Sequence, residues 1–153
     1  MTDVTDHPAG ADARARELLA RLETTAGGTL VGRLGIEFLE AGPETVVARM
    51  PVEGNTQFHG LLHGGATAAL AESVGSVAAS LHAGPQARAV GTELSASHHR
   101  AARTGHVTAR TTPLHQGRRT ATYDITVVDD DGRRICTARL SCMILEAGTG
   151  SAG

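Results

Sequence analysis

The amino-acid sequence predicts an α+β protein in which an antiparallel sheet wraps around one central helix. Three observations lead to this fold class: two alternating segments joined by a turn, then a long and largely apolar helical segment, then four further alternating segments. Because no helical segment separates the last four, parallel pairing through helical crossovers is excluded. The chain has 153 residues, which suits one domain with one hydrophobic core.

A short helix and a hairpin are predicted first. Residues 11–28 carry three leucines at helical spacing and end on a glycine pair, which indicates an amphipathic helix. Residues 33–52 alternate apolar and polar side chains around the turn signal Ala-Gly-Pro-Glu at 41–44, which predicts a hairpin. We expect residues 1–10 and 147–153 to be mobile ends of a domain that spans 11–146.

The central helix is predicted from Gly64 to about His82. This segment has no proline, and it is apolar or small nearly all round, so we expect it to be enclosed with other backbone close to it. Four strands follow and are expected to be antiparallel neighbours; they span 87–100, 105–117, 118–130 and 133–146. The chain has only three aromatic side chains, so each core residue buries little apolar area. This favours an oligomer, in which a partner subunit buries additional surface.

Charge and cysteine content exclude several classes of protein. The net charge is −2 with no block of like charge, so we expect neither nucleic-acid nor membrane partners. The start has no signal-peptide pattern and no segment is long and apolar enough to cross a membrane, so a soluble cytoplasmic protein is expected. Cys136 and Cys142 are six residues apart on one predicted strand, about 20 Å, and cannot pair within the chain. We expect buried thiols, with a reactive thiol as the alternative.

Residues 59–76 (HGLLHGGATAALAESVGS) carry the candidate chemistry. A helix that starts at Gly64 offers unpaired backbone N–H groups and the positive end of its dipole to a ligand. Glu72 lies two turns further on, and Ser76 lies one turn beyond it on the same face. We expect oxyanion donors, carboxylate and hydroxyl to converge, which is the arrangement that acyl transfer needs.

Residues 55–76 resemble the signature of PaaI-type hotdog-fold thioesterases. The similarity covers about residues 30–145 and is greatest to bacterial 1,4-dihydroxy-2-naphthoyl-CoA and aromatic acyl-CoA hydrolases. It implies a hotdog fold that hydrolyses an acyl-CoA, with an aromatic acyl group as the commonest choice. It also implies a homodimer or a dimer of dimers (homotetramer), with the site at the dimer interface. No metal or cofactor is implied beyond the coenzyme A of the substrate.

The resemblance also implies roles for individual residues. Glu72 matches the catalytic carboxylate, as nucleophile or general base, and Gly64 matches the residue whose N–H polarises the thioester carbonyl. Gln57 and His63 match polar groups near the thioester, and Ser76 matches the hydroxyl after the acid. The coenzyme A nucleotide is expected to contact His98, Arg100, Gly117, Arg118 and Arg119. His59 has no role that the resemblance transfers.

Each of these residues also has a simpler, structural interpretation. Glu72 could be an exposed or arginine-paired carboxylate, Ser76 a small helix residue, and Gln57 a loop residue. His98 and His99 are expected to face opposite ways on a strand, so that at most one contacts a given ligand. The spacing of His59 and His63 would suit a metal only on a helix, and the glycines around them indicate a loop.

Two other functions remain open at this point. A hotdog hydratase or dehydratase would use a histidine and an acid, here His63 and Glu72, for proton transfer on the acyl chain. A non-catalytic acyl-CoA-binding module would bind the thioester without releasing a thiol.

Overall fold

The computed structural model describes the backbone of residues 9–42 and 44–146, and the side chains from Ala13 onwards. The predicted mobile ends therefore lie outside the described residues, except that the first helix begins at Ala9. The helices are α1 (Ala9–Thr25), the short η1 (Ala26–Gly28) and α2 (Leu30–Arg33), and α3 (Gly64–Ala83). The strands are β1 (Glu37–Ala41), β2 (Val46–Pro51), β3 (Ala87–His98), β4 (His106–Gln116), β5 (Thr120–Asp129) and β6 (Arg134–Glu146).

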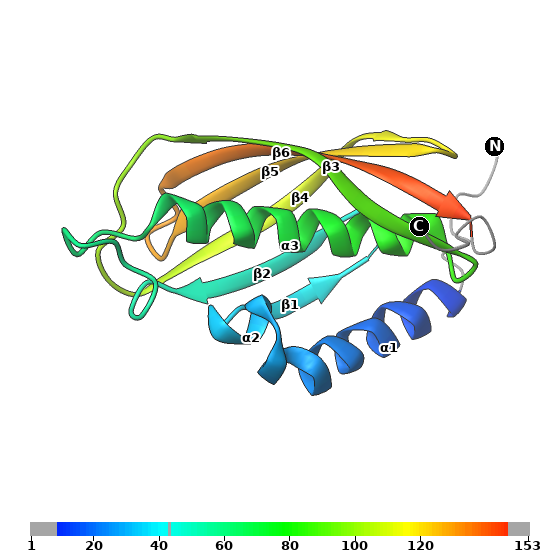
Figure 1. Ribbon diagram of the computed structural model, residues 1–153, viewed down its shortest axis with the longest axis horizontal. Helices are drawn as coiled ribbons and strands as arrows, with labels where there is room; N and C mark the ends of the chain where they lie inside the picture. The colour runs from blue at the N-terminus through cyan, green and yellow to red at the C-terminus, as the bar shows by residue number, and fades with distance from the viewer. Residues whose placement is uncertain (1–8, 43, 147–153) are drawn as a thin grey trace, which may run out of the picture.

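The fold class is confirmed: six antiparallel strands form one sheet that curves along α3 (Figure 1). The strand order is β1-β2-β4-β5-β6-β3, so β1 and β3 are the two edges. The predicted hairpin is present as β1 and β2, although the turn residue Pro43 is not described. None of the described helices is long and apolar enough to cross a membrane.

One expected pairing is wrong. Consecutive strands β3 and β4 are not neighbours, because β3 crosses to the far side of the sheet and pairs with β6. The backbone groups on the outer side of β3 have no strand beside them within the described chain, although β3 is twelve residues long. A long free edge of this kind is a place where a second strand can add.

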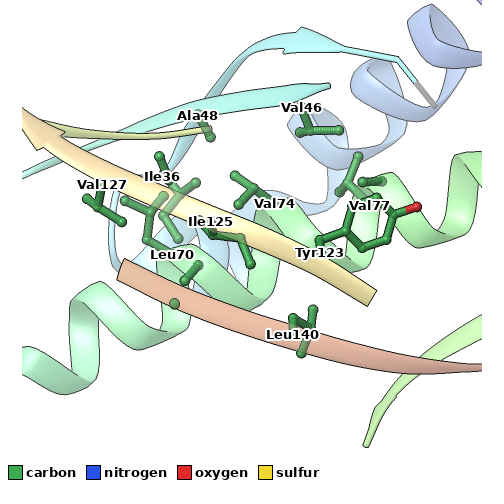
Figure 2. Packing of buried hydrophobic residues seen from close by; sticks show 14 of the residues in the cluster. Ile36, Val46, Ala48, Leu70, Val74, Val77, Tyr123, Ile125, Val127 and Leu140 are labelled. Carbon is green, nitrogen blue, oxygen red and sulfur yellow. The ribbon is translucent and has the colours of Figure 1, made fainter. Parts of the chain in front are cut away.

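The core lies between the sheet and one face of α3. Figure 2 shows the side chains that fill it, which come from α3 (Leu70, Val74, Val77), β2 (Val46, Ala48), β5 (Tyr123, Ile125, Val127) and β6 (Leu140). Gly75 lets α3 approach β6 closely, since a Cβ there would lie 2.5 Å from Cδ2 of Leu140. The close approach of backbone expected for this helix is therefore present.

Residues close in sequence determine where α3 begins and where it ends. His63 is the N-cap residue at the start of the helix. At the other end Gly84 adopts a φ of 91°, which glycine reaches without strain, and Pro85 follows. Arg14 of α1 donates to the carbonyl oxygens of Ser80 and Leu81 at 2.8 and 3.4 Å, which places a cation at the negative end of the helix dipole.

Candidate active site

The start of α3 supplies the first group of the site. His63 Nδ1 accepts a hydrogen bond from the Gly65 N–H at 2.8 Å, so the neutral ring carries its proton on Nε2. The N–H groups of Ala66 and Thr67 donate to the His63 carbonyl oxygen at 3.0 and 3.2 Å. The Gly64 N–H has no acceptor within the part of the chain that the structure describes. It is therefore available to a ligand at the positive end of the helix.

Four of the predicted residues meet in one cavity of about 390 Å³, lined by Gln57, Gly64, His98 and Arg100 among others. The imidazole of His98 lies directly against Gly64, because a Cβ at Gly64 would be 2.9 Å from His98 Nε2. Any side chain at position 64 would displace that ring. The glycine thus keeps the helix N-terminus and the histidine in contact.

His99 corrects an expectation. It lines the same cavity as His98, although the two were expected to face opposite ways. The strand β3 ends at His98, so the alternation of a strand no longer applies to the next residue. His99 Nε2 lies 2.9 Å from the Thr137 hydroxyl on β6, which fixes its ring at the rim of the sheet.

Gln57 is held by a tight loop. Its N–H donates to the Leu61 carbonyl at 2.8 Å, and its carbonyl accepts from the Gly60 N–H at 2.9 Å. The side-chain oxygen accepts from the His59 N–H, so the NH₂ group is the part of the amide that can serve a ligand. His59 is exposed and its ring lies 4.0 Å from the exposed ring of Phe58.

Glu72 lies in a second cavity, also of about 390 Å³. Ser76 lines the same cavity, so the expected shared face of carboxylate and hydroxyl is present. The other walls are mainly apolar and come from α1 (Leu22), α2 (Leu30, Val31), β1 (Phe38) and α3 (Val77). Glu72 is exposed in the single chain, and none of the described residues forms an ion pair with it. The arginine-paired interpretation therefore does not apply among them.

The expected convergence of amide and carboxylate does not occur within one chain. Gly64 and Glu72 are eight residues apart on α3, which is about 12 Å along the helix axis at 1.5 Å per residue. They line different cavities, and His63 lines a third with Leu30 and Leu34. A single chain therefore holds the Gly64 amide and the Glu72 carboxylate in separate cavities.

The residues expected to contact coenzyme A are divided in the same way. His98 and Arg100 line the same cavity as Gly64, the first residue of α3. Figure 1 shows that β3, which ends at His98, runs toward the end of the molecule where α3 begins. Gly117, Arg118 and Arg119 form the turn between β4 and β5 at the opposite end, where His82 near the end of α3 lies 2.9 Å from the Gly117 carbonyl. Since α3 has twenty residues, about 30 Å separates the two groups.

The charge of Glu72 acts on a buried thiol of β6. Burial raises the pKa of the Cys142 thiol, and the charge of Glu72 raises it further. Burial also raises the pKa of Cys136. Both thiols are buried, as expected. Among residues 9–42 and 44–146 the structure shows no group of three or more His, Cys, Asp or Glu side chains placed to hold a metal ion.

The sequence reasoning missed the walls of the Glu72 cavity. Leu22 and Phe38 come from elements far from Glu72 in the chain, and neither carries a signal beyond ordinary core periodicity. It also missed Gly91 on β3, which lies against the Glu72 carboxylate. Only its position as a lone glycine inside a predicted strand could have drawn attention to it.

Residues 59–136 match the Thioesterase superfamily, and the chain belongs to this family of hotdog-fold thioester hydrolases. The proofreading thioesterase EntH of Cronobacter turicensis is 48 % identical over 128 residues, which cover 83 % of this chain and 93 % of that protein. The resemblance drawn from the sequence is thus confirmed for the family, the fold and the enzyme class.

Solved structures of similar proteins support the same fold. Thioesterase HI1161 from Haemophilus influenzae superposes with a TM-score of 0.82 at 34 % identity, covering 88 % of this chain and 94 % of that chain. The Escherichia coli PaaI protein shares the fold at 21 % identity, with a TM-score of 0.79 and coverage of 90 % and 97 %. Two mutants of SAV0944 from Staphylococcus aureus match at 29 % identity, with TM-scores of 0.74 and 0.73, covering 77 % and 76 % of this chain and 99 % and 98 % of theirs. One replaces a glutamate by alanine, and the other a glutamine fifteen positions earlier.

Proposed function

We propose that the protein hydrolyses an aromatic acyl-CoA to the free acid and coenzyme A, at a site shared by two copies of the chain. Glu72 is the catalytic carboxylate in this proposal, and the Gly64 N–H is the oxyanion donor. The observation that carries it is a pair of complementary half-sites. One cavity holds an amide without an acceptor, and the other holds a carboxylate without a cation, among the residues described.

The chemistry follows from these groups. The thioester carbonyl oxygen accepts from the Gly64 N–H, where the helix dipole stabilises the negative charge that develops on it. The Gln57 NH₂ group is in the same cavity and can add a second donor. His63 already uses Nδ1 to cap α3, so its part is to hold the helix start in place rather than to act as a base through that nitrogen.

Glu72 can act in two ways. As a nucleophile it attacks the carbonyl carbon, the carbon–sulfur bond breaks, coenzyme A leaves as a thiolate, and water then hydrolyses the acyl–Glu72 anhydride. As a general base it takes a proton from water, the hydroxide attacks the carbon, and the proton passes to the departing thiolate. A single turnover in ¹⁸O water separates the routes, because only the anhydride route places the label in the Glu72 carboxylate.

A homodimer through β3 would unite the half-sites. Antiparallel pairing of two free β3 edges implies a two-fold axis, which also makes the two α3 helices antiparallel. With the axis crossing α3 midway between Gly64 and Glu72, near Ala68, Gly64 of one copy lies beside Glu72 of the second copy. Near Glu72, α3 carries three small, half-buried residues that permit such an approach, namely Ala68, Ala69 and Ser73.

The same axis would gather the coenzyme A residues. It brings the end of one copy that holds His98 and Arg100 next to the end of the second copy that holds the turn of residues 117–119. A dimer of dimers is the second expectation, and exposed apolar side chains on β3 and β6, at Val90, Met143 and Leu145, offer it a surface. The mass of the particle in solution tests both.

The relatives support the assignment of Gln57 and Glu72. These two residues are fifteen positions apart, the same separation as the glutamine and glutamate that were replaced in SAV0944. The apolar walls of the Glu72 cavity, with Phe38 among them, support an aromatic acyl group, since an aromatic ring packs well against such walls.

A thiol-release screen tests the substrate. We expect the highest kcat/KM for aromatic acyl-CoA, at least tenfold above medium-chain acyl-CoA. Because the EntH relatives are named proofreading thioesterases, the panel includes mismatched acyl groups on coenzyme A and on carrier protein. A preference for medium-chain acyl groups would overturn the aromatic assignment, and hydration of an enoyl-CoA without free thiol would overturn the hydrolase.

A further inference from the structure

The strand β3 contains a single glycine, Gly91, at the point where the strand passes Glu72. A Cβ built on Gly91 would lie 3.2 Å from Glu72 Oε1 and 4.0 Å from its Cδ. The φ angle of Gly91 is not positive, so any residue can adopt its backbone conformation. A side chain at this position would therefore be disfavoured by steric contact and not by the backbone conformation.

The region beneath Gly91 is already filled. Gly91 pairs with Cys142 on β6, and Cys142 and Leu140 are each only 1 % exposed. Leu140 Cδ1 lies 3.5 Å from the Cβ position of Gly91, which leaves the carboxylate on one side of it and the core on the other. The core has no room for a side chain at position 91, so that side chain would contact Glu72 and displace its carboxylate.

The backbone at Gly91 is fixed by an irregularity in the strand. The pairing of β3 with β6 shifts between Gly91 and Glu93, with Thr92 as the extra residue. The Thr92 hydroxyl donates to the Ser141 carbonyl at 3.0 Å and ties the bulge to β6. Bulges of this kind occur next to active sites, where they set the aim of neighbouring groups.

The helix side is fixed as well. Gly75, less than one turn beyond Glu72, packs against Leu140 so closely that a Cβ there would be 2.5 Å from its Cδ2. Gly75 and Gly91 thus flank Leu140 from the helix and from the strand. Neither α3 nor β3 can move apart from the other without opening the core around this leucine.

We propose that Gly91 is a positioning residue, whose missing side chain gives the Glu72 carboxylate its catalytic place over β3. This inference rests on the proposed role of Glu72. A methyl group at 91 moves the carboxylate without removing it. The 3.2 Å contact requires the carboxylate to move by only a few tenths of an ångström. Since a displacement of about 1 Å in a reacting group can cost about 100-fold, we expect Gly91→Ala to lower kcat by about 3- to 10-fold. KM should change less than about threefold, and Gly91→Val should lose more.

A double-mutant cycle separates positioning from a general structural effect. Glu72→Asp shortens the side chain and withdraws the carboxylate from Gly91. If both changes act through the same contact, the loss caused by Glu72→Asp is at least threefold smaller in the Gly91→Ala background than in the wild type. Losses that multiply independently overturn the proposal.

Two controls complete the design. Ser95→Thr adds one methyl group to the exposed face of the same strand and should leave kcat within about twofold of wild type. Glu72→Ala is assayed in parallel. Loss of activity in Glu72→Ala with wild-type kcat in Gly91→Ala overturns the positioning role and leaves the proposed function intact. Full activity in Glu72→Ala overturns both.

Discussion

Glu72 is an exposed carboxylate with apolar neighbours and no described cation beside it. In a single chain this arrangement costs little, because water reaches the side chain. Once a second copy or a substrate covers the cavity, the carboxylate loses part of that water, and its interactions with a bound thioester become stronger. In the proposed dimer, Glu72 therefore serves catalysis and not the stability of one chain.

Replacement of Glu72 tests this directly. Both Glu72→Ala and Glu72→Gln should lower kcat for thiol release at least 100-fold, the usual size of an acid–base or nucleophilic contribution. The free energy of unfolding should change by less than about 0.5 kcal/mol, since no described ion pair is lost. Glu53→Gln, an exposed carboxylate outside both cavities, is the matched control. Turnover at the wild-type rate without Glu72 would remove it from the mechanism.

The two thiols behave as core side chains. Cys136 is 0 % and Cys142 is 1 % exposed, and burial raises the pKa of both, so the reactive thiolate is scarce at neutral pH. We expect neither to react with a disulfide reagent at pH 8 within minutes, and both to react after unfolding in guanidinium chloride. Rapid modification of the native protein would contradict this and revive the reactive-thiol alternative.

At the scale of elements, the contact between α3 and β6 decides how the helix sits in the sheet. Gly75 is the point of closest approach to Leu140, and both are buried. A glycine in mid-helix costs about 1 kcal/mol relative to alanine, so the sequence accepts weaker helix propensity in return for this contact. The position of Glu72, less than one turn away, depends on it.

Gly75→Ala should therefore destabilise the protein. Overpacking against Leu140 costs about 1–3 kcal/mol, and the better helix propensity of alanine offsets at most about 1 kcal/mol. Urea unfolding measures the difference. The control is Gly27→Ala, where no atom lies within 4 Å of the added Cβ, and stability there should stay the same or rise by about 0.4–1 kcal/mol. A more stable Gly75→Ala would show that Leu140 moves aside freely.

At the scale of the whole molecule, the single chain is incomplete in two respects. It leaves one edge of β3 without a neighbouring strand among the described residues. It also separates Gly64, the proposed oxyanion donor, from Glu72 by about 12 Å along α3. A dimer with one two-fold axis would pair the two β3 edges and bring Gly64 of one copy close to Glu72 of the other. The proposed dimer would therefore serve both the chemistry and the β3 edge.

Complementation between two inactive variants tests the shared site. Gln57→Ala and Glu72→Ala are each expected to be inactive, but a hybrid dimer has one site with both residues intact and one with neither. Random exchange makes half of the dimers hybrid, so the mixture should regain about a quarter of the wild-type activity. Each variant exchanged with itself is the control. No recovery, in a mixture shown to contain hybrids, would place the site within one chain.

Local features of the fold were predictable from the sequence. The limits of α3 agree within one residue, because the glycines, the N-cap histidine and Gly84 with Pro85 act at the helix ends themselves. The shared face of Glu72 and Ser76 follows from the helical repeat alone. The strands were recognisable by alternation, but the partner of β3 was not, because neighbours in a sheet are chosen by packing over many residues of separation.

The sequence by itself determined the helix, its carboxylate and the family to which the chain belongs. Only the tertiary structure decided that Gly64 and Glu72 occupy separate cavities, that the residues expected to bind coenzyme A lie at opposite ends of the molecule, and that Gly91 lies beneath the carboxylate. The physical reason is distance. A sequence motif specifies which groups share one helix, whereas their separation in space and their neighbours on other strands are set by how the sheet closes around that helix.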